Sequence, residues 1–310
     1  MNTPTFTALG IDVGGTKIAA GVVTFPEGRV GARRQISTRP ERGGESVLID
    51  VLGLARELAD EAKAVGLTVG GLGLGLCELV SPEGTILSAN CVRWQDQPVR
   101  EQLSSIASVT IEADVRAAAL AEAHFGAGRG ARVFLYVTIG TGISSCLVLD
   151  GQPFAGARGA TGTVASSPWP RAPETSQPDC ALEEVASGPA LARRFQQLHG
   201  NAQSGQDVLA AAGAGNAVAL GVARSAGEAM GATIGWLVNV LDPERVVIGG
   251  GLGLSEGPYW ESCVDSARKH IWSEVHRDLP IVKAATGADA GIIGAAAASW
   301  LKQQQKRGEN

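Results

Sequence analysis

Residues 8–23 read Ala-Leu-Gly-Ile-Asp-Val-Gly-Gly-Thr-Lys-Ile-Ala-Ala-Gly-Val-Val. Strand-like residues run into a short turn of glycine and threonine, and a second strand-like run follows, which is the pattern of a β-hairpin. Glycine lets the backbone approach a bulky anion, with the amide groups directed into the concavity of the turn. The stretch therefore predicts a hairpin whose open turn, Gly14, Gly15 and Thr16, binds phosphate.

A second hairpin of the same kind is predicted about 125 residues later. Residues 135–149 contain an apolar run, a turn at Gly140, Thr141 and Gly142, and a further apolar run. One such turn is weak evidence, because most glycine-rich bends are only turns. Two of them, with an acidic residue in the first, predict two related half-domains that bind one polyphosphate.

Asp12 lies inside the first hairpin. A carboxylate beside phosphate groups repels them unless a cation intervenes, so Asp12 is predicted to orient hydrated Mg²⁺ through water. The alternative is an aspartate that hydrogen-bonds its own backbone in the turn. Lys17 is a candidate phosphate contact, although a solvated lysine at the edge of a strand explains it slightly better.

Asp114 follows the strand-like residues 109–112 and precedes an alanine-rich helical segment, 115–125. It is therefore predicted at or near the N-cap of that helix, a position that needs no further function. A kinase, however, requires a rigidly held carboxylate that accepts the proton of the acceptor hydroxyl. Because Asp114 also lies just before a glycine-rich hinge, residues 126–130, we regard it as the candidate catalytic base.

Helical and strand-like segments alternate along the chain, which predicts an α/β fold. Residues 69–76 alternate glycine with leucine and indicate a buried strand against which something packs closely. Further helices are expected over 46–65, 217–241 and 292–302. Gly249, Gly250 and Gly251 follow a buried strand, 245–248, and are candidates to hold a nucleotide base and ribose, with a plain turn as the alternative.

Composition excludes several classes of function. Among 310 residues, 45% are hydrophobic and 18% charged, as in globular proteins of one large or two smaller domains. The net charge of −5 argues against nucleic-acid binding. The five scattered cysteines contain no C-x-x-C pair, and the longest apolar run falls short of the ~20 residues of a membrane span. We therefore expect a cytoplasmic protein with no nucleic-acid or membrane partner.

These motifs together resemble the ROK family of sugar kinases and repressors, within the actin-like ATPase superfamily. Matching segments are Gly10 to Lys17, Asp114 with its helix, and residues 125–131, 140–142, 188–190, 239–251 and 289–295. The resemblance implies a two-domain α/β fold of the actin-like ATPase (ribonuclease H-like) type. It also implies ATP and Mg²⁺ in the interdomain cleft, a homodimer, and Asp114 as general base. The expected domains are 1–125, joined by the C-terminal helix 290–310, and 126–289.

The sugar-binding side departs from the family pattern. Cys77 and Glu78 replace a Pro-Gly pair, Ala113 replaces an Asn, and Thr163 and Ser166 replace a Glu and a His. The family's cysteine-rich zinc motif has shrunk to Cys180 within residues 177–181, so no zinc is expected. The candidate substrate-binding residues are Glu78, Asn90, Asp114, Thr163, Ser166 and Glu183.

The predicted function is an ATP-dependent kinase that phosphorylates a primary hydroxyl of a sugar or sugar-like polyol. Losing a partner for a substrate hydroxyl costs ~1–3 kcal/mol, so the departures favour a C7-cyclitol or an aminosugar over glucose. Glu78 either recognises a substrate amine or merely fills the site. The alternative function is a non-catalytic sugar- or metabolite-sensing module that kept the fold.

Overall fold

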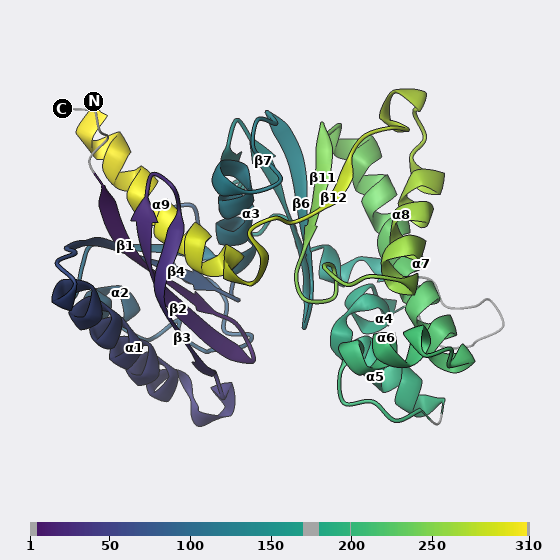
Figure 1. The fold of residues 1–310 in the computed structure, drawn as a ribbon, viewed down its shortest axis with the longest axis horizontal. Coiled ribbons are helices and arrows are strands. Elements are labelled where there is room, and N and C mark those ends of the chain that lie inside the picture. The colour runs from purple at the N-terminus through teal and green to yellow at the C-terminus, as the bar shows by residue number, and fades with distance from the viewer. Residues whose placement is uncertain (1–4, 170–179, 199, 309–310) are drawn as a thin grey trace. The chain divides into compact units, whose positions relative to one another are not determined.

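A computed structural model describes residues 5–169, 180–198 and 200–308 (Figure 1). The chain divides into two compact units. The first comprises the described residues of 1–130, 151–161 and 288–310, and the second those of 131–150 and 162–287. Segment 151–161, which sequence alone assigned to the second domain, thus lies in the first unit.

The first unit contains a sheet with strand order β3-β2-β1-β4-β5. The strands are β1 (Phe6–Val13), β2 (Lys17–Phe25), β3 (Arg29–Ser37), β4 (Val69–Leu76) and β5 (Val109–Ala113). β1, β2 and β3 are antiparallel, whereas β4 is parallel to both β1 and β5. The predicted first hairpin is β1–β2, with its turn at Gly14, Gly15 and Thr16.

The strand β3 was not predicted from the sequence. Side chains along β3 alternate between exposed and partly buried, and none is fully buried. A strand at the edge of a sheet has only a weak apolar signal, because only one of its faces touches the core.

The alternation of glycine and leucine in β4 separates two packing surfaces. Leu72, Leu74 and Leu76 join a core with the apolar face of α1 (Gly44–Ala64). The opposite, glycine face of the sheet contacts α9 (Ala290–Gly308). A Cβ atom at Gly73 would lie 1.7 Å from the carbonyl oxygen of Ala295, so only glycine permits this approach. The predicted close packing is confirmed.

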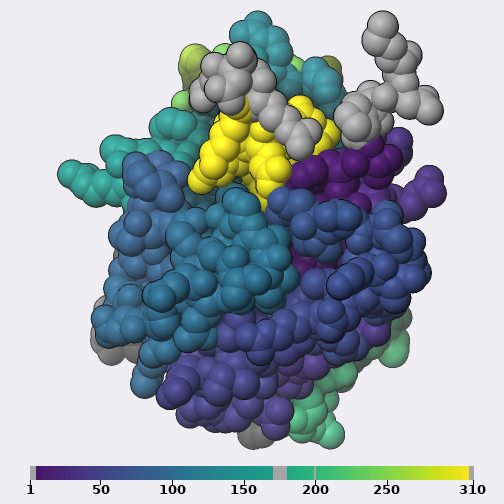
Figure 2. All heavy atoms as spheres, turned by 90° about the vertical axis from the view of Figure 1, so that its left-hand side faces the viewer, coloured from purple at the N-terminus to yellow at the C-terminus, as the bar shows by residue number. Residues whose placement is uncertain are grey.

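The helix α3 (Asp114–Phe125) packs beside α9 in the same layer. A Cβ at Gly294 would lie 1.7 Å from the carbonyl oxygen of Ala117. Figure 2 shows the outer side of α9 in yellow, bordered by the purple and blue surface of the first unit. A short helix, α2 (Val99–Leu103), precedes β5, and β8 (Gln152–Pro153) lies in segment 151–161.

The second unit contains a mixed sheet in which β12, β11, β6 and β7 are neighbours in that order. These strands are β6 (Val133–Ile139), β7 (Ile143–Leu149), β11 (Arg245–Gly249) and β12 (Ile281–Lys283). The second predicted hairpin is β6–β7, and β6, β11 and β12 run parallel. A two-residue ladder joins β9 (Pro168–Trp169) and β10 (Cys180–Ala181).

Helices complete the second unit. They are α4 (Glu183–Ala186), α5 (Gly188–Gln197), α6 (Gly205–Gly213), α7 (Ala217–Leu241) and α8 (Pro258–His270). Ser187 caps α5 and separates it from α4. No single helix in the described ranges is long and apolar enough to cross a bilayer; α6 and α7 would qualify only as a pair, and they are bent by 120°.

Candidate active site

The turn of the first hairpin is held in place by a residue from outside it. The amide of Gly14 donates to the carbonyl of Lys17 (3.0 Å), which closes the turn. The hydroxyl of Thr38 donates to the carbonyl of Gly14 (2.6 Å), and the amide of Thr38 donates to the carbonyl of Thr16 (3.1 Å). Thr38 is fully buried. The sequence could not indicate it, because it follows β3 rather than the glycine-rich motif.

Asp12 and Asp114 lie close together at one edge of the first sheet. Gly75 of β4 pairs with Asp12, and a Cβ at Gly75 would lie 3.7 Å from both the Asp12 Oδ1 and the Asp114 Cα. Both aspartates are partly buried. Asp114 is the first residue of α3 and follows its N-cap, Ala113, so it lies near the N-cap as expected. The Asp114 carboxylate accepts a hydrogen bond from the amide of Val115 (2.6 Å).

The electrostatics of this pair suit proton transfer. Burial, reinforced by the charge of Asp12, raises the pKa of Asp114 to about 7, although the Val115 amide and Arg116 act in the opposite direction. Burial raises the pKa of Asp12 to about 6, with Lys17 opposing it. A general base works best when its pKa lies near the operating pH. Asp114 therefore meets this requirement.

Asp12 is also the residue best suited to hold Mg²⁺. Magnesium prefers carboxylate and water oxygens, and a cation would offset the charge that burial makes costly. A Cβ at Gly291 would lie 2.3 Å from the Asp12 Oδ2, so the first turn of α9 lies directly against this carboxylate. The donor type and position fit a water-mediated Mg²⁺ ion.

Glu78 is buried and does not present its carboxylate to a substrate. Its Oε1 accepts hydrogen bonds from the amides of Cys91 (2.6 Å) and Val92 (2.9 Å). Its Oε2 accepts from the amide of Asn90 (2.9 Å) and from the hydroxyl of Ser88. The prediction of Glu78 as a substrate contact is therefore corrected: four donors occupy the carboxylate, which holds loop 88–92 in place. Asn90 is exposed on that loop.

The thiols of Cys77 and Cys91 lie next to the carboxylates of Asp12 and Asp114. The pKa of Cys77 is raised by burial, then by the charge of Asp114 and by its neighbour Cys91, so the thiol is neutral. A Cβ at Gly15 would lie 3.1 Å from the Cys91 sulfur. Cys77 and Cys91 therefore connect the surroundings of Asp114 with the turn of the first hairpin. Sequence alone identified only the replacement of Pro by Cys77.

Arg116 supports the same region and was missed from the sequence. It is buried, forms an ion pair with Glu112, and donates to the carbonyls of Val80 (2.7 Å) and Gly159 (3.1 Å). A guanidinium bound on several sides fixes the start of α3 relative to the loop that follows β4. The sequence did not indicate this role, because Arg116 stands within an alanine-rich helix and belongs to no recognisable motif.

In the second unit, the glycine-rich turn that follows β11 packs against the turn between β6 and β7. The amides of Leu252 (2.9 Å) and Gly253 (3.0 Å) donate to the carbonyl of Ile139, the residue before Gly140. Gly250 has φ +82°, and a Cβ there would lie 2.4 Å from the same carbonyl oxygen. The turn at Gly249, Gly250 and Gly251 thus folds onto the turn at Gly140, Thr141 and Gly142.

Glu183 contacts this hairpin directly. Its Oε2 accepts a hydrogen bond from the amide of Ile143 (2.8 Å), and a Cβ at Gly142 would lie 2.9 Å from the same oxygen. Thr163 and Ser166 are exposed on a short 3₁₀ turn, where the Ser166 hydroxyl donates to the Thr163 carbonyl (3.0 Å). Contacts of these three residues with a substrate stay predictions.

The predicted remnant of a zinc motif lies partly outside the described residues, at 177–179. Cys180 is buried, and its thiol faces the carbonyl of Trp169 (3.6 Å). Within the described ranges, no three His, Cys, Asp or Glu side chains are grouped so that they could hold a metal ion.

A family model described as "ROK family" matches residues 8–304. The chain belongs to the ROK family. It is 30% identical to a glucokinase of Halalkalibacterium halodurans, over 96% of this chain and 95% of that protein. The similarity to the family therefore extends over nearly the whole chain and includes both units.

Solved structures confirm the predicted actin-like ATPase fold. The ROK hexokinase of Thermus thermophilus is 32% identical, with a TM-score of 0.78 over 97% of this chain and 100% of that chain. The ROK glucokinase of Streptomyces griseus, in complex with glucose and AMPPNP, is 26% identical, with a TM-score of 0.81 over 95% of this chain and 99% of that chain.

Proposed function

We propose that this ROK protein is an ATP-dependent kinase that phosphorylates a primary hydroxyl of a sugar or sugar-like polyol. The observation that carries the proposal is the Asp12–Asp114 pair, in which burial raises the pKa of Asp114 to about 7. A sensing module has no need of a carboxylate poised to accept a proton. Glucokinase and hexokinase relatives support the same reaction class.

Each element of the site has a part in this reaction. Asp114 accepts the proton of the acceptor hydroxyl as the phosphoryl group is transferred. Backbone amides of the turns at 14–16 and 140–142 stabilise the charge on the phosphates of ATP. The turn at 249–251 would hold the nucleoside, Lys17 would contribute a positive charge at the rim of its hairpin, and Asp12 would hold Mg²⁺ through water. When bound, Mg²⁺ would supply positive charge beside the phosphates.

The substrate is a polyol whose ring hydroxyls are bound by fewer polar side chains than in the usual family pattern. Ala113, Thr163 and Ser166 are short side chains at positions where the family pattern has Asn, Glu and His. Because four donors already occupy the Glu78 carboxylate, the argument for recognition of an amine falls away. This favours a C7-cyclitol, with an aminosugar second and glucose third, and we expect a kcat/KM at least ~100-fold higher for the cyclitol than for glucose.

Turnover with Mg-ATP across a panel of acceptors tests the proposal. The panel contains glucose, N-acetylmannosamine, glucosamine and C7-cyclitols, and ADP release is measured with wild-type protein and with Asp114→Asn. Turnover of at least one acceptor that depends on Asp114 supports the kinase. No turnover of any acceptor, with retained binding, favours the sensing module instead. Efficient phosphorylation of glucose with inert cyclitols would refute the substrate preference alone.

We also propose that the protein is a homodimer formed through α7. Trp236 and Val240 are 58% and 57% exposed one turn apart on this helix. Trp272 is 86% exposed, and its amide donates to the Asn239 side chain of the same helix. Apolar side chains that gather on one surface mark interaction sites. Light scattering should give twice the chain mass, and Trp236→Ser/Trp272→Ser should give the monomer; a monomeric wild type would exclude the dimer.

A further inference from the structure

A cavity of the first unit lies at the opposite end of β5 from Asp114. It has a volume of about 280 Å³ and is lined from α2, β5 and α9. β5 begins there at Val109 and ends at Ala113, beside Asp114, so roughly 13 Å of strand separates the cavity from the site described above. We call this cavity the basic pocket, after its residues Arg100, Lys302 and Lys306.

The charged residues that line the basic pocket are all cationic. Arg100, Lys302 and Lys306 contribute three positive charges and no carboxylate is present in the lining, although the chain as a whole has a net charge of −5. Lys302 and Lys306 lie four residues apart on α9, so both side chains project from the same face of that helix. Cationic side chains of this kind attract an anion.

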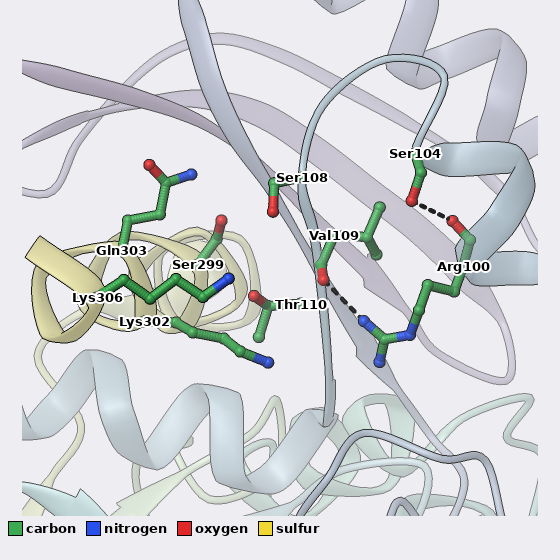
Figure 3. A pocket seen from close by; sticks show the side chains of 9 residues that line it. All are labelled: Arg100, Ser104, Ser108, Val109, Thr110, Ser299, Lys302, Gln303 and Lys306. Carbon is green, nitrogen blue, oxygen red and sulfur yellow. Dashed lines mark hydrogen bonds between the residues drawn. The ribbon is translucent and has the colours of Figure 1, made fainter.

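The position of Arg100 is fixed before any ligand arrives. Its guanidinium donates to the carbonyls of Val109 (2.8 Å) and Gly84 (3.0 Å), and it forms no ion pair with a carboxylate of the described residues. Figure 3 shows Lys302 and Lys306 extending from α9 toward Thr110, with Arg100 on the other side of β5. A preorganised cation reduces the entropy lost when a ligand binds.

The uncharged residues that line the basic pocket indicate which other chemical groups the anion has. Ser108 and Thr110 supply hydroxyl groups. The Ser104 hydroxyl donates to the Arg100 carbonyl and the Gln303 amide to the Gly70 carbonyl, so these two side chains offer the pocket acceptor oxygens. Hydroxyls and amides bind polyols, whereas cations bind phosphate. The volume lies just below the range of about 300–1,000 Å³ in which drug-sized ligands bind, so it suits a molecule the size of a phosphorylated monosaccharide.

We propose that the basic pocket is a second, non-catalytic site for a phosphate monoester of a small polyol. The identity of the polyol rests on the proposed function, since such monoesters are the products of that reaction. The pocket is also linked to the active site through α9: Lys302 lies toward one end of this helix, and Gly291 at the other end contacts Asp12. A bound product would therefore contact the same helix that supports Asp12.

The test measures binding to the intact protein without ATP, with glucose 6-phosphate and inorganic phosphate as separate probes. Calorimetry is performed on wild-type protein, on Lys302→Gln/Lys306→Gln and on the control Lys63→Gln/Lys269→Gln. Both pairs remove two lysines that are exposed on helices, so the net charge changes equally. Protection of Lys302 from an amine-reactive acetylating reagent, compared with Lys63, shows where the probe binds.

We expect the Lys302→Gln/Lys306→Gln variant to bind glucose 6-phosphate at least 10-fold more weakly, with the control unchanged, and the ligand to slow labelling of Lys302 at least 3-fold. An unchanged affinity or unprotected Lys302 overturns the site. Equal affinity for inorganic phosphate overturns the monoester and assigns the pocket to free phosphate. Because neither readout requires turnover, failure of the kinase proposal in the acceptor panel stays distinguishable from failure of this one.

Discussion

Replacing Asp114 with asparagine should abolish most of the activity and at the same time stabilise the protein. The side chain keeps its shape, and its oxygen can still accept the hydrogen bond of the Val115 amide. The substitution removes only a charge that burial and Asp12 make unfavourable. We expect kcat to fall by about 10²–10⁴, the usual contribution of a general base.

The gain in stability follows from the difference in pKa between the folded and unfolded states. Asp114 titrates at about 7 in the folded protein and near its ordinary value of 3.8 in the unfolded chain. Because the folded pKa is raised, the folded state binds the extra proton between these values, and stability falls as pH rises through this window. The difference corresponds to about 4 kcal/mol above pH 7, which we reduce to about 2–4 kcal/mol for a partly exposed side chain.

Urea unfolding at pH 8, 6 and 4 measures this effect. At pH 8 the Asp114→Asn variant should be more stable than wild type by about 2–4 kcal/mol, and at pH 4 the two proteins should differ by less than about 1 kcal/mol. The exposed carboxylate Asp60, changed to asparagine, is the control and should show no such trend. In parallel, wild-type kcat/KM should rise with pH up to about 7 and then level off. A variant that is less stable than wild type at pH 8 would refute the reasoning.

Three further predictions concern other parts of the chain. Glu78→Gln places an amide NH₂ against two hydrogen-bond donors, so KM for the acceptor should rise about 10-fold by loosening loop 88–92, while kcat changes less than about 3-fold; steady-state kinetics with an unchanged KM would contradict this role. Gly73→Ala puts a Cβ 1.7 Å from the Ala295 carbonyl and should cost more than about 4 kcal/mol or prevent folding, as judged by soluble yield and urea unfolding; near-wild-type stability would show that α9 can shift. Elemental analysis of protein purified without chelator should find no stoichiometric zinc, because Cys180 alone cannot form a tetrahedral site; one zinc per chain would overturn this.

The sequence by itself determined the features that are encoded locally. Hydrophobic alternation and glycine position predicted both hairpins, since a turn that approaches phosphate needs glycine within a few residues of its strands. The glycine–leucine repeat of β4 predicted a buried strand against which something packs closely, and the strand–Asp114–helix junction predicted a candidate base. Each of these signals lies within a single short segment, so no knowledge of distant residues was needed.

Only the tertiary structure decided how distant segments act on these motifs. Thr38, which follows β3, donates a hydrogen bond to the turn of the first hairpin. Arg116 donates to the carbonyls of Val80 and Gly159, which are distant from it in the sequence. Glu78 changed from a substrate contact to a support for loop 88–92, because its four donors come from residues 10 to 14 positions further along the chain. The elevated pKa of Asp114 likewise depends on burial and on Asp12, about 100 residues earlier. Hydrogen bonds, burial and charge act through space, and a linear pattern records only the residue types that take part.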